Sequence, residues 1–263
     1  MIETEKQDVD LLAGDPAIEA MFKVGAHFGY KRTRRHPTTG GYVFGVKNNV
    51  EIIDLEKTKT GLDEAVNFVK RLAAEGKTLL FVGNKKESQE AVREAALSVS
   101  MPYVSNRWIG GTLTNWSEIK KRLLRLEDLS TKKEKGELSI YTKRERVMID
   151  RDIQDLERLF GGIRDVRSVP HALFVVDPRE EETAVREATR LKIPVVALAS
   201  TDCDVSLVTH AIVANDSSRS SIGFFVGEIA KAFAEGRSAG LPKVEERDEV
   251  SPEADPKEAT IEK

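Results

Sequence analysis

Cationic and aromatic side chains are interleaved in one short window of this sequence, residues 20–50. The window has six lysines and arginines and no aspartate or glutamate, and residues 25–37 read Gly-Ala-His-Phe-Gly-Tyr-Lys-Arg-Thr-Arg-Arg-His-Pro. Lysine and arginine bind phosphate oxygens, and aromatic rings stack on unpaired bases. We therefore expect an exposed loop that contacts nucleic acid. Its candidate contacts are Lys31, Arg32, Arg34, Arg35 and His36, with Lys47 further along the window.

Two further groups of cations extend the same chemistry. Lys85 and Lys86 lie at the start of an expected helix, and Lys120, Lys121 and Arg122 follow one another on a second helix. Either group alone is more often a solvated helix face. Together with the basic window they favour RNA, which proteins recognise largely through shape and backbone contacts.

The charge of the whole chain conceals this distribution. A formal charge of −3 and a pI near 6.0 at first argue against a nucleic-acid partner. However, residues 1–19 carry a net charge of −5 and residues 243–263 carry −4, whereas residues 20–50 carry +6. We expect an acidic extension at 1–20 and a disordered acidic tail at 242–263, because the tail has too few apolar residues to bury.

Catalytic patterns are absent from the sequence. Gly83 and the pair Gly110 and Gly111 do not form a phosphate-binding glycine motif, and no Ser/His/Asp combination stands out. The remaining alternative is a sugar-phosphate or nucleotide-binding enzyme with its ligand at the strand ends near Gly83 and Thr201, because open parallel sheets bind ligands there.

Metal-ligand spacing is also weak. The four histidines and the single cysteine show no zinc-site spacing. His27, Asp202 and Asp204 are weak candidates for holding a Mg or Zn ion, although carboxylates that cap loops are commoner, and no other cofactor is expected. Cys203 lies between two aspartates, which disfavours a reactive thiolate. One cysteine fits a reducing compartment, and no apolar run is long enough to span a membrane.

Short apolar runs alternate with longer amphipathic ones, which is typical of parallel strands linked by helices. Strands are predicted at 78–82, 103–107, 172–176, 195–199 and 211–214. Helices are predicted at about 56–75, 86–98, 180–191 and 217–235, with Gly76 and Gly236 as stops. Residues 42–46 and 50–53 are predicted to pair as a hairpin. The fold class is therefore α/β, with a five-stranded parallel sheet and helices on both faces.

One segment breaks this alternation. The apolar residues of 116–126 and of 149–160 recur at steps of three and four. Such heptad steps predict two helices that pair as an antiparallel coiled-coil hairpin with a narrow apolar seam, which should protrude. We thus expect an α/β domain formed by 21–115 and 161–241, with a hairpin inserted at 116–160.

Five motifs occur in an order that resembles one known family. They are residues 24–29 (Val-Gly-Ala-His-Phe-Gly), 55–58 (Leu-Glu-Lys-Thr), 80–83 (Leu-Phe-Val-Gly), 106–115 (Asn-Arg-Trp-Ile-Gly-Gly-Thr-Leu-Thr-Asn) and 170–177 (Pro-His-Ala-Leu-Phe-Val-Val-Asp). The chain resembles the bacterial small-subunit ribosomal protein S-two family from about residue 21 to residue 236.

The resemblance implies a flavodoxin-like sheet, a protruding coiled coil and no enzyme activity. It implies binding to small-subunit ribosomal RNA and to neighbouring ribosomal proteins, including the large first protein of that subunit. A cytoplasmic location on the ribosome follows, with no membrane partner and no homo-oligomer. Carried over by position, the implied RNA contacts are 31–37, Arg107, Trp108 and the cations around Lys120. The sequence departs from relatives at Tyr30, where histidine is frequent, and at Arg35 and His36, where Trp-Asn is usual, so the loop is expected to contact RNA in altered detail. Departures at Ser200 and Val205 weaken the expectation of a metal.

Overall fold

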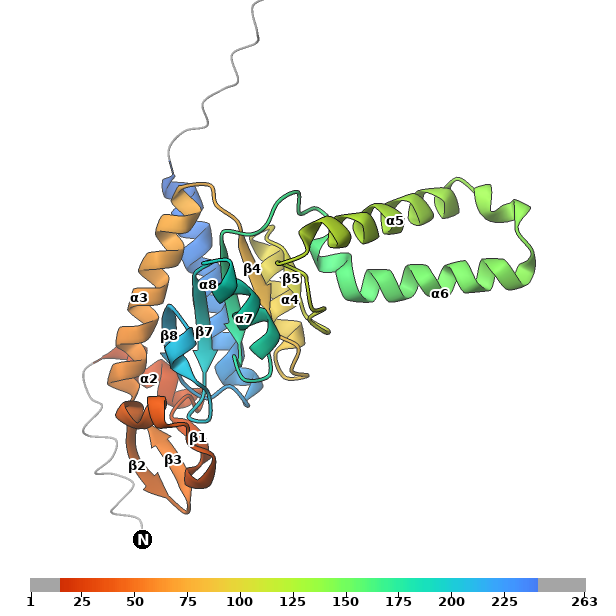
Figure 1. Cartoon of the computed structure of the whole chain (residues 1–263). Helices are drawn as coiled ribbons and strands as arrows, with labels where there is room; N and C mark the ends of the chain where they lie inside the picture. The colour runs from red at the N-terminus through yellow and green to blue at the C-terminus, as the bar shows by residue number, and fades with distance from the viewer. Residues whose placement is uncertain (1–14, 241–263) are drawn as a thin grey trace, which may run out of the picture.

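The computed structural model describes residues 15–240, so most of the predicted acidic extension lies outside the described residues. The predicted disordered tail at 242–263 also lies outside them. At the centre of the described part is a sheet of five strands (Figure 1). The strands are β4 (Leu79–Val82), β5 (Tyr103–Val104), β6 (Ala172–Val176), β7 (Val195–Ala199) and β8 (His210–Val213).

Their order is β5-β4-β6-β7-β8, and every neighbouring pair is parallel. The predicted five-stranded parallel α/β fold is confirmed. The strand expected at 103–107 is wrong in extent, because residues 105–107 leave the sheet after Val104 and enter a loop. The strands β4, β6 and β7 are buried at every position, which explains why their sequences are apolar throughout.

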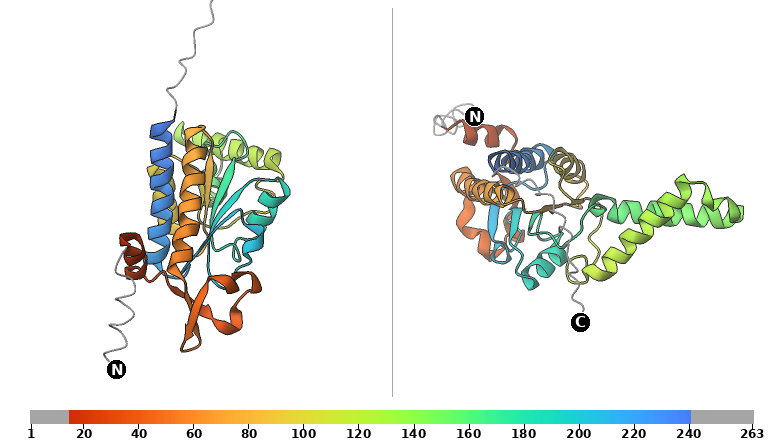
Figure 2. Two further views of the ribbon diagram at one scale, coloured as in Figure 1. Left: turned by 90° about the vertical axis from the view of Figure 1, so that its left-hand side faces the viewer. Right: turned by 90° about the horizontal axis from the view of Figure 1, so that it is seen from above.

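Three helices cover one face of this sheet: α3 (Leu55–Ala74), α4 (Gln89–Ser98) and α8 (Arg219–Ala239), as Figure 2 shows. Alternate strand residues point into this layer, where Phe81 and Phe174 pack edge to face with ring centroids 5.7 Å apart. Gly236 is not the predicted stop, because α8 continues to Ala239. A Cβ at this glycine would lie 2.3 Å from the Lys70 carbonyl oxygen, so Gly236 permits close packing of α8 on α3.

The opposite face packs against α7 (Glu182–Arg190) and the loop that follows β5. Leu80, Leu173 and Val195 point to this side together with Trp108 and residues of α7. Helices therefore lie on both faces of the sheet, as predicted.

A smaller antiparallel sheet adjoins the carboxyl end of the main sheet. It follows α2 (Pro16–Lys23) and has the order β1-β3-β2, from β1 (Phe28–Lys31), β2 (Val43–Lys47) and β3 (Val50–Ile53). The predicted hairpin is confirmed, and Asn48 and Asn49 in its turn have positive φ angles of 53° and 64°. The loop expected at 25–37 is partly wrong, because residues 28–31 pair with β3 as a strand.

Thr201, just after β7, links the small sheet to the main sheet through two hydrogen bonds. The backbone N–H of Tyr30 donates to its hydroxyl oxygen at 3.0 Å, and the Thr39 hydroxyl donates to its carbonyl oxygen at 2.7 Å. Thr201 and Thr39 are fully buried. The basic window is thus anchored at the strand ends rather than attached as a mobile loop.

Two helices, α5 (Trp116–Glu134) and α6 (Lys143–Phe160), lie side by side and project from the main sheet (Figures 1 and 2). A 3-10 turn at Glu137–Ile140 joins them, and a capping box of Thr142 and Glu145 begins α6. Ile119 and Leu123 at the root of α5 belong to the core under the sheet, whereas Leu126 is buried outside that core. The winding of the two helices as a coiled coil, and the domain boundaries drawn around them, stay predictions.

Proline at Ser130, in the outer half of α5, should therefore disrupt the hairpin and leave the sheet folded. A proline inside a helix removes a backbone hydrogen bond and costs about 3 kcal/mol or more. Circular dichroism should show reduced helix content, while the urea midpoint followed by tryptophan fluorescence should match that of Ser130→Ala. A large fall in that midpoint would show that the outer hairpin is part of the cooperative core.

Candidate nucleic-acid interface

The small sheet brings two predicted contacts together. Lys31 in β1 and Lys47 in β2 both pair with Val50 of the central strand β3, so they flank it on the same face. Arg32 and Arg34 follow in a 3-10 turn, and all four side chains are exposed. Residues far apart in the window thus form one cationic end of the molecule.

Arg35 and His36 have partners inside the protein. The Arg35 guanidinium lies 3.5 Å from Glu51 Oε1, whose side chain is fully buried and accepts no hydrogen bond. His36 donates its backbone N–H to the Thr201 carbonyl oxygen at 2.8 Å, and its Nδ1 lies 2.8 Å from the Thr38 hydroxyl. Both residues lie at the same end of the molecule as Lys31, and each also stabilises the local fold.

Lys85 was predicted as an RNA contact from its residue type, but its side chain is mostly buried inside the protein. Its ammonium forms ion pairs with Asp177 and Asp216 and lies 3.4 Å from the Tyr30 hydroxyl. Burial lowers the pKa of Lys85, but the carboxylates of Asp216 and Asp177 raise it further, so the group stays charged. Lys86, the next residue, is exposed.

Glu187 holds the loop after β5 in place, and the motifs did not reveal it. Its carboxylate accepts hydrogen bonds from the Trp108 indole (3.0 Å), from the hydroxyl of Thr114 (3.1 Å), and from the backbone N–H groups of Gly111 (2.8 Å), Leu113 (3.0 Å) and Thr114 (3.1 Å). Burial raises the pKa of Glu187, whereas these hydrogen bonds lower it by more, so the net shift is downward. One signal was present: Glu187 lies three residues after Ala184, one helical turn along, and both are buried in α7.

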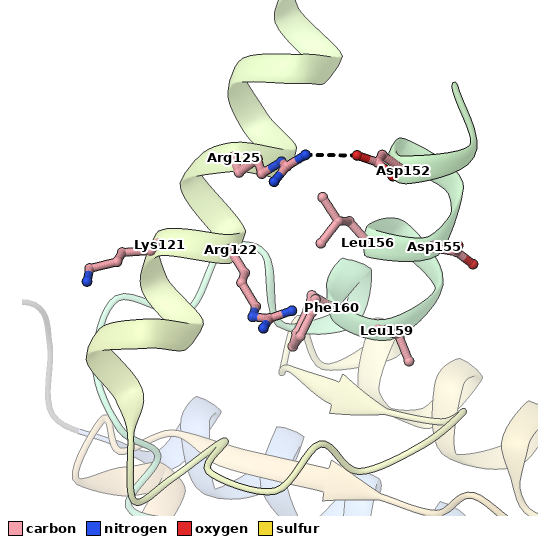
Figure 3. Close-up of a pocket in the computed structure, with 8 residues that line it drawn as sticks. All are labelled: Lys121, Arg122, Arg125, Asp152, Asp155, Leu156, Leu159 and Phe160. Atoms are coloured by element: carbon pink, nitrogen blue, oxygen red, sulfur yellow. Dashed lines mark hydrogen bonds and ion pairs between the residues drawn. The ribbon is translucent and has the colours of Figure 1, made fainter. Parts of the chain in front are cut away.

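This carboxylate shapes the loop that precedes the hairpin. Trp108 is 7% exposed, so its ring is unavailable for stacking on a base, whereas Arg107 beside it is exposed. The three cations at the root of α5, Lys120, Lys121 and Arg122, are all exposed. Figure 3 shows Arg122 beside Phe160 in a groove between α5 and α6, next to the ion pair of Arg125 with Asp152 at 2.8 Å.

The three weak metal candidates do not meet. The ring of His27 stacks on Phe22 at 4.4 Å, Asp202 pairs with Arg179, and Asp204 accepts from Ser206. A bound Mg or Zn ion at these residues stays a prediction, and the geometry adds no support to it.

Another group has closer spacing: the ligand atoms of Asp177, Cys203 and Asp216 all lie within 4.8 Å of one another. The Lys85 ammonium already forms ion pairs with both of its carboxylates. Burial, and then the charge of Asp177, raise the pKa of the Cys203 thiol, which favours the protonated form.

The carboxyl edge of the sheet, where the alternative hypothesis placed an enzyme ligand, is filled by the chain's own side chains. Lys85, Asp177, Asp216 and Thr201 follow β4, β6, β8 and β7 in turn and bond to one another or to the small sheet. Exposed cations instead lie on the small sheet and at the root of the hairpin. These features define an α/β protein with two exposed cationic surfaces.

Comparison with known proteins assigns the family. The family described as Ribosomal protein S2 matches residues 21–236. Proteins named small ribosomal subunit protein uS2 are similar: that of Sulfurimonas denitrificans is 43% identical over 236 residues, covering 88% of this chain and 91% of the relative. Those of Wolinella succinogenes and Roseiflexus sp. are each 42% identical, covering 88% and 84% of this chain and 86% and 85% of the relatives.

The chain belongs to the ribosomal protein S2 family. The predicted family and the predicted structural, non-enzymatic role are confirmed by this membership, and the alternative of a sugar-phosphate or nucleotide-binding enzyme is not supported. Among residues 15–240, the structure has no helix both long and apolar enough to cross a membrane.

Proposed function

We propose that this chain is a structural constituent of the small ribosomal subunit that binds small-subunit ribosomal RNA through the cationic end of its small sheet. The observation that carries the proposal is the convergence of Lys31 and Lys47 on either side of Val50, next to the turn that holds Arg32 and Arg34. Several cations on one surface can follow the phosphates of a folded RNA.

The remaining candidates divide according to their surroundings. Lys86, Arg107, Lys120, Lys121 and Arg122 are exposed and suit a second phosphate contact along the loop and the hairpin root. Lys85 and Trp108 hold the fold together through Asp177, Asp216 and Glu187, so we assign them no direct contact.

Protein partners complete the proposal. Relatives carry the name of small-subunit proteins, which supports a location on the ribosome with neighbouring ribosomal proteins as partners. The large first protein of the subunit stays an expected partner that rests on the family resemblance alone. No homo-oligomer is required, because the cationic surfaces described above belong to a single chain.

Replacing Lys31 and Lys47 together with alanine should weaken binding to small-subunit particles that lack this protein by about tenfold at 0.1 M salt. Each lost phosphate contact should also reduce the slope of log affinity against log salt by about one. Titration of the labelled chain across a salt series measures both.

The matched control is Arg93→Ala with Lys231→Ala, which removes two exposed cations from α4 and α8. It should leave affinity and slope close to those of the unchanged protein. Equal losses of affinity in the two double variants would show that the effect comes from net charge and not from the position of the cations. Binding of the unchanged chain that does not depend on salt would contradict the proposed function.

A further inference from the structure

Arg34 lies over an aromatic ring that the rest of the protein holds in place. Its guanidinium carbon is 5.8 Å from the centroid of the Tyr30 ring, within the range of a cation–π contact. Arg34 is exposed and, within residues 15–240, forms no ion pair. We propose that Tyr30 is a positioning residue, which orients the Arg34 guanidinium for phosphate contact. The inference rests on the proposed function.

Tyr30 is held in place at its backbone and at its hydroxyl. The backbone N–H of Tyr30 donates to the Thr201 hydroxyl oxygen at 3.0 Å, and the Tyr30 hydroxyl oxygen accepts from the Ser217 hydroxyl at 2.8 Å. The Lys85 ammonium lies 3.4 Å from the same oxygen. Thr201, Ser217 and Lys85 follow three different strands of the main sheet, so the ring takes its orientation from the sheet and not from the turn that carries Arg34.

The charges around the ring preserve its attraction for arginine. Lys85 is also close to the ring, with its ammonium 5.9 Å from the centroid, and an uncompensated charge there would repel Arg34. The side-chain carboxylates of Asp177 and Asp216, which are 5% and 0% exposed, balance that ammonium. The net charge beneath the ring is therefore not positive.

A guanidinium held over an aromatic ring suits phosphate recognition. The cation–π contact uses none of the N–H donors in an ion pair, so they stay available for paired hydrogen bonds with phosphate oxygens. Holding the long side chain near its bound orientation also reduces the entropy lost on binding. The ring thus acts on RNA only through Arg34, and this distinguishes positioning from direct contact.

A matched pair of variants isolates the ring. Tyr30→Phe and Tyr30→Leu both remove the hydroxyl, but only the leucine removes the aromatic face. We expect Tyr30→Leu to weaken binding to small-subunit particles lacking this protein about threefold, the effect of an exposed cation–π contact, and Tyr30→Phe to change it by less than about 1.5-fold. In the Arg34→Ala background, Tyr30→Leu should have no further effect.

Three outcomes would overturn the inference: equal losses in Tyr30→Phe and Tyr30→Leu, an undiminished effect of Tyr30→Leu without Arg34, or no effect at all. If the unchanged chain itself fails to bind the particles with a salt-dependent affinity, the proposed function fails instead.

A second measurement does not depend on the folding of Tyr30→Leu. In the unchanged protein, nuclear magnetic resonance should show the side-chain protons of Arg34 shifted upfield by the ring current, with Arg34→Ala providing the assignment. Side-chain shifts typical of a solvated arginine would contradict the cation–π contact.

Discussion

Replacing Glu187 with glutamine is expected to lower the free energy of unfolding by about 2–4 kcal/mol. The carboxylate accepts from the Trp108 indole and Gly111 on one oxygen and from Leu113 and Thr114 on the other. An amide NH2 must replace one of these oxygens, so at least two donors lose their acceptor, and each unsatisfied buried donor costs about 1–3 kcal/mol. Urea denaturation followed by tryptophan fluorescence gives the difference.

Glu182→Gln on the same helix is the control. Glu182 is exposed and pairs only with Arg186 one turn away, a contact worth at most a few tenths of a kcal/mol to about 1 kcal/mol. Similar midpoints for the two glutamine variants would show that the hydrogen bonds to Glu187 do not stabilise the loop.

The same carboxylate predicts a pH dependence. Because the pKa of Glu187 is lower in the folded chain than in the unfolded one, where it is about 4.3, its stabilising effect is complete above that value. It is lost as the pH falls through the folded pKa. The difference in stability between the unchanged protein and Glu187→Gln should therefore shrink as the pH is lowered below about 4, and a constant difference would contradict this origin.

Replacing Lys85 with methionine is expected to cost about 3–5 kcal/mol, because the two carboxylates it pairs with are buried. Burial, and then the charge of Asp177, already raise the pKa of Asp216 to about 7 while Lys85 opposes the shift. Because Asp216 binds a proton more readily in the folded chain than in the unfolded one, the unchanged protein already loses stability as the pH rises toward about 7. Without the ammonium the pKa of Asp216 rises further, so the variant should lose more stability than the unchanged protein between pH 5 and 8.

Lys86→Met, at the exposed neighbouring position, should leave the free energy of unfolding within about 0.5 kcal/mol of the unchanged value. Adding Asp216→Asn to Lys85→Met should recover part of the loss, since one of the two unbalanced charges is removed. A tolerated Lys85→Met, with a pH profile like that of the unchanged protein, would mean that water rather than Lys85 balances the cluster.

The strands of the main sheet could be predicted because they are buried on both faces, which leaves continuous apolar runs such as 172–176. Strand β1 could not be predicted. Its residues Phe28–Lys31 include turn-forming and cationic types, and they form a strand because they pair with β3, some twenty residues later. Gly29 shows how close this packing is: a Cβ there would lie 2.8 Å from the Thr201 Cγ2. The partner strand, and not local propensity, decides the structure here.

The candidate site was predicted by residue type, and type does not report burial. Lys31 and Lys85 look equivalent in the sequence, but Lys85 follows β4 at the edge where the residues after β6 and β8 bring two aspartates. Trp108 was expected to be a contact because the family resemblance implies one there, yet Glu187, 79 residues later, holds its indole inside. Such pairings depend on the strand order, which a single sequence does not show.

The hydrogen bonds between Glu187 and the loop after β5 also affect the direction of the projecting helices. Helix α5 has 19 residues and begins directly after the residues that Glu187 holds. At about 1.5 Å per residue it is a lever about 28 Å long, so a tilt of about 10° at its root would carry its far end about 5 Å. The hydrogen bonds to Glu187, together with the buried Ile119 and Leu123 at the root of α5, therefore help to set the direction of both helices, and a small displacement there becomes largest at their far end.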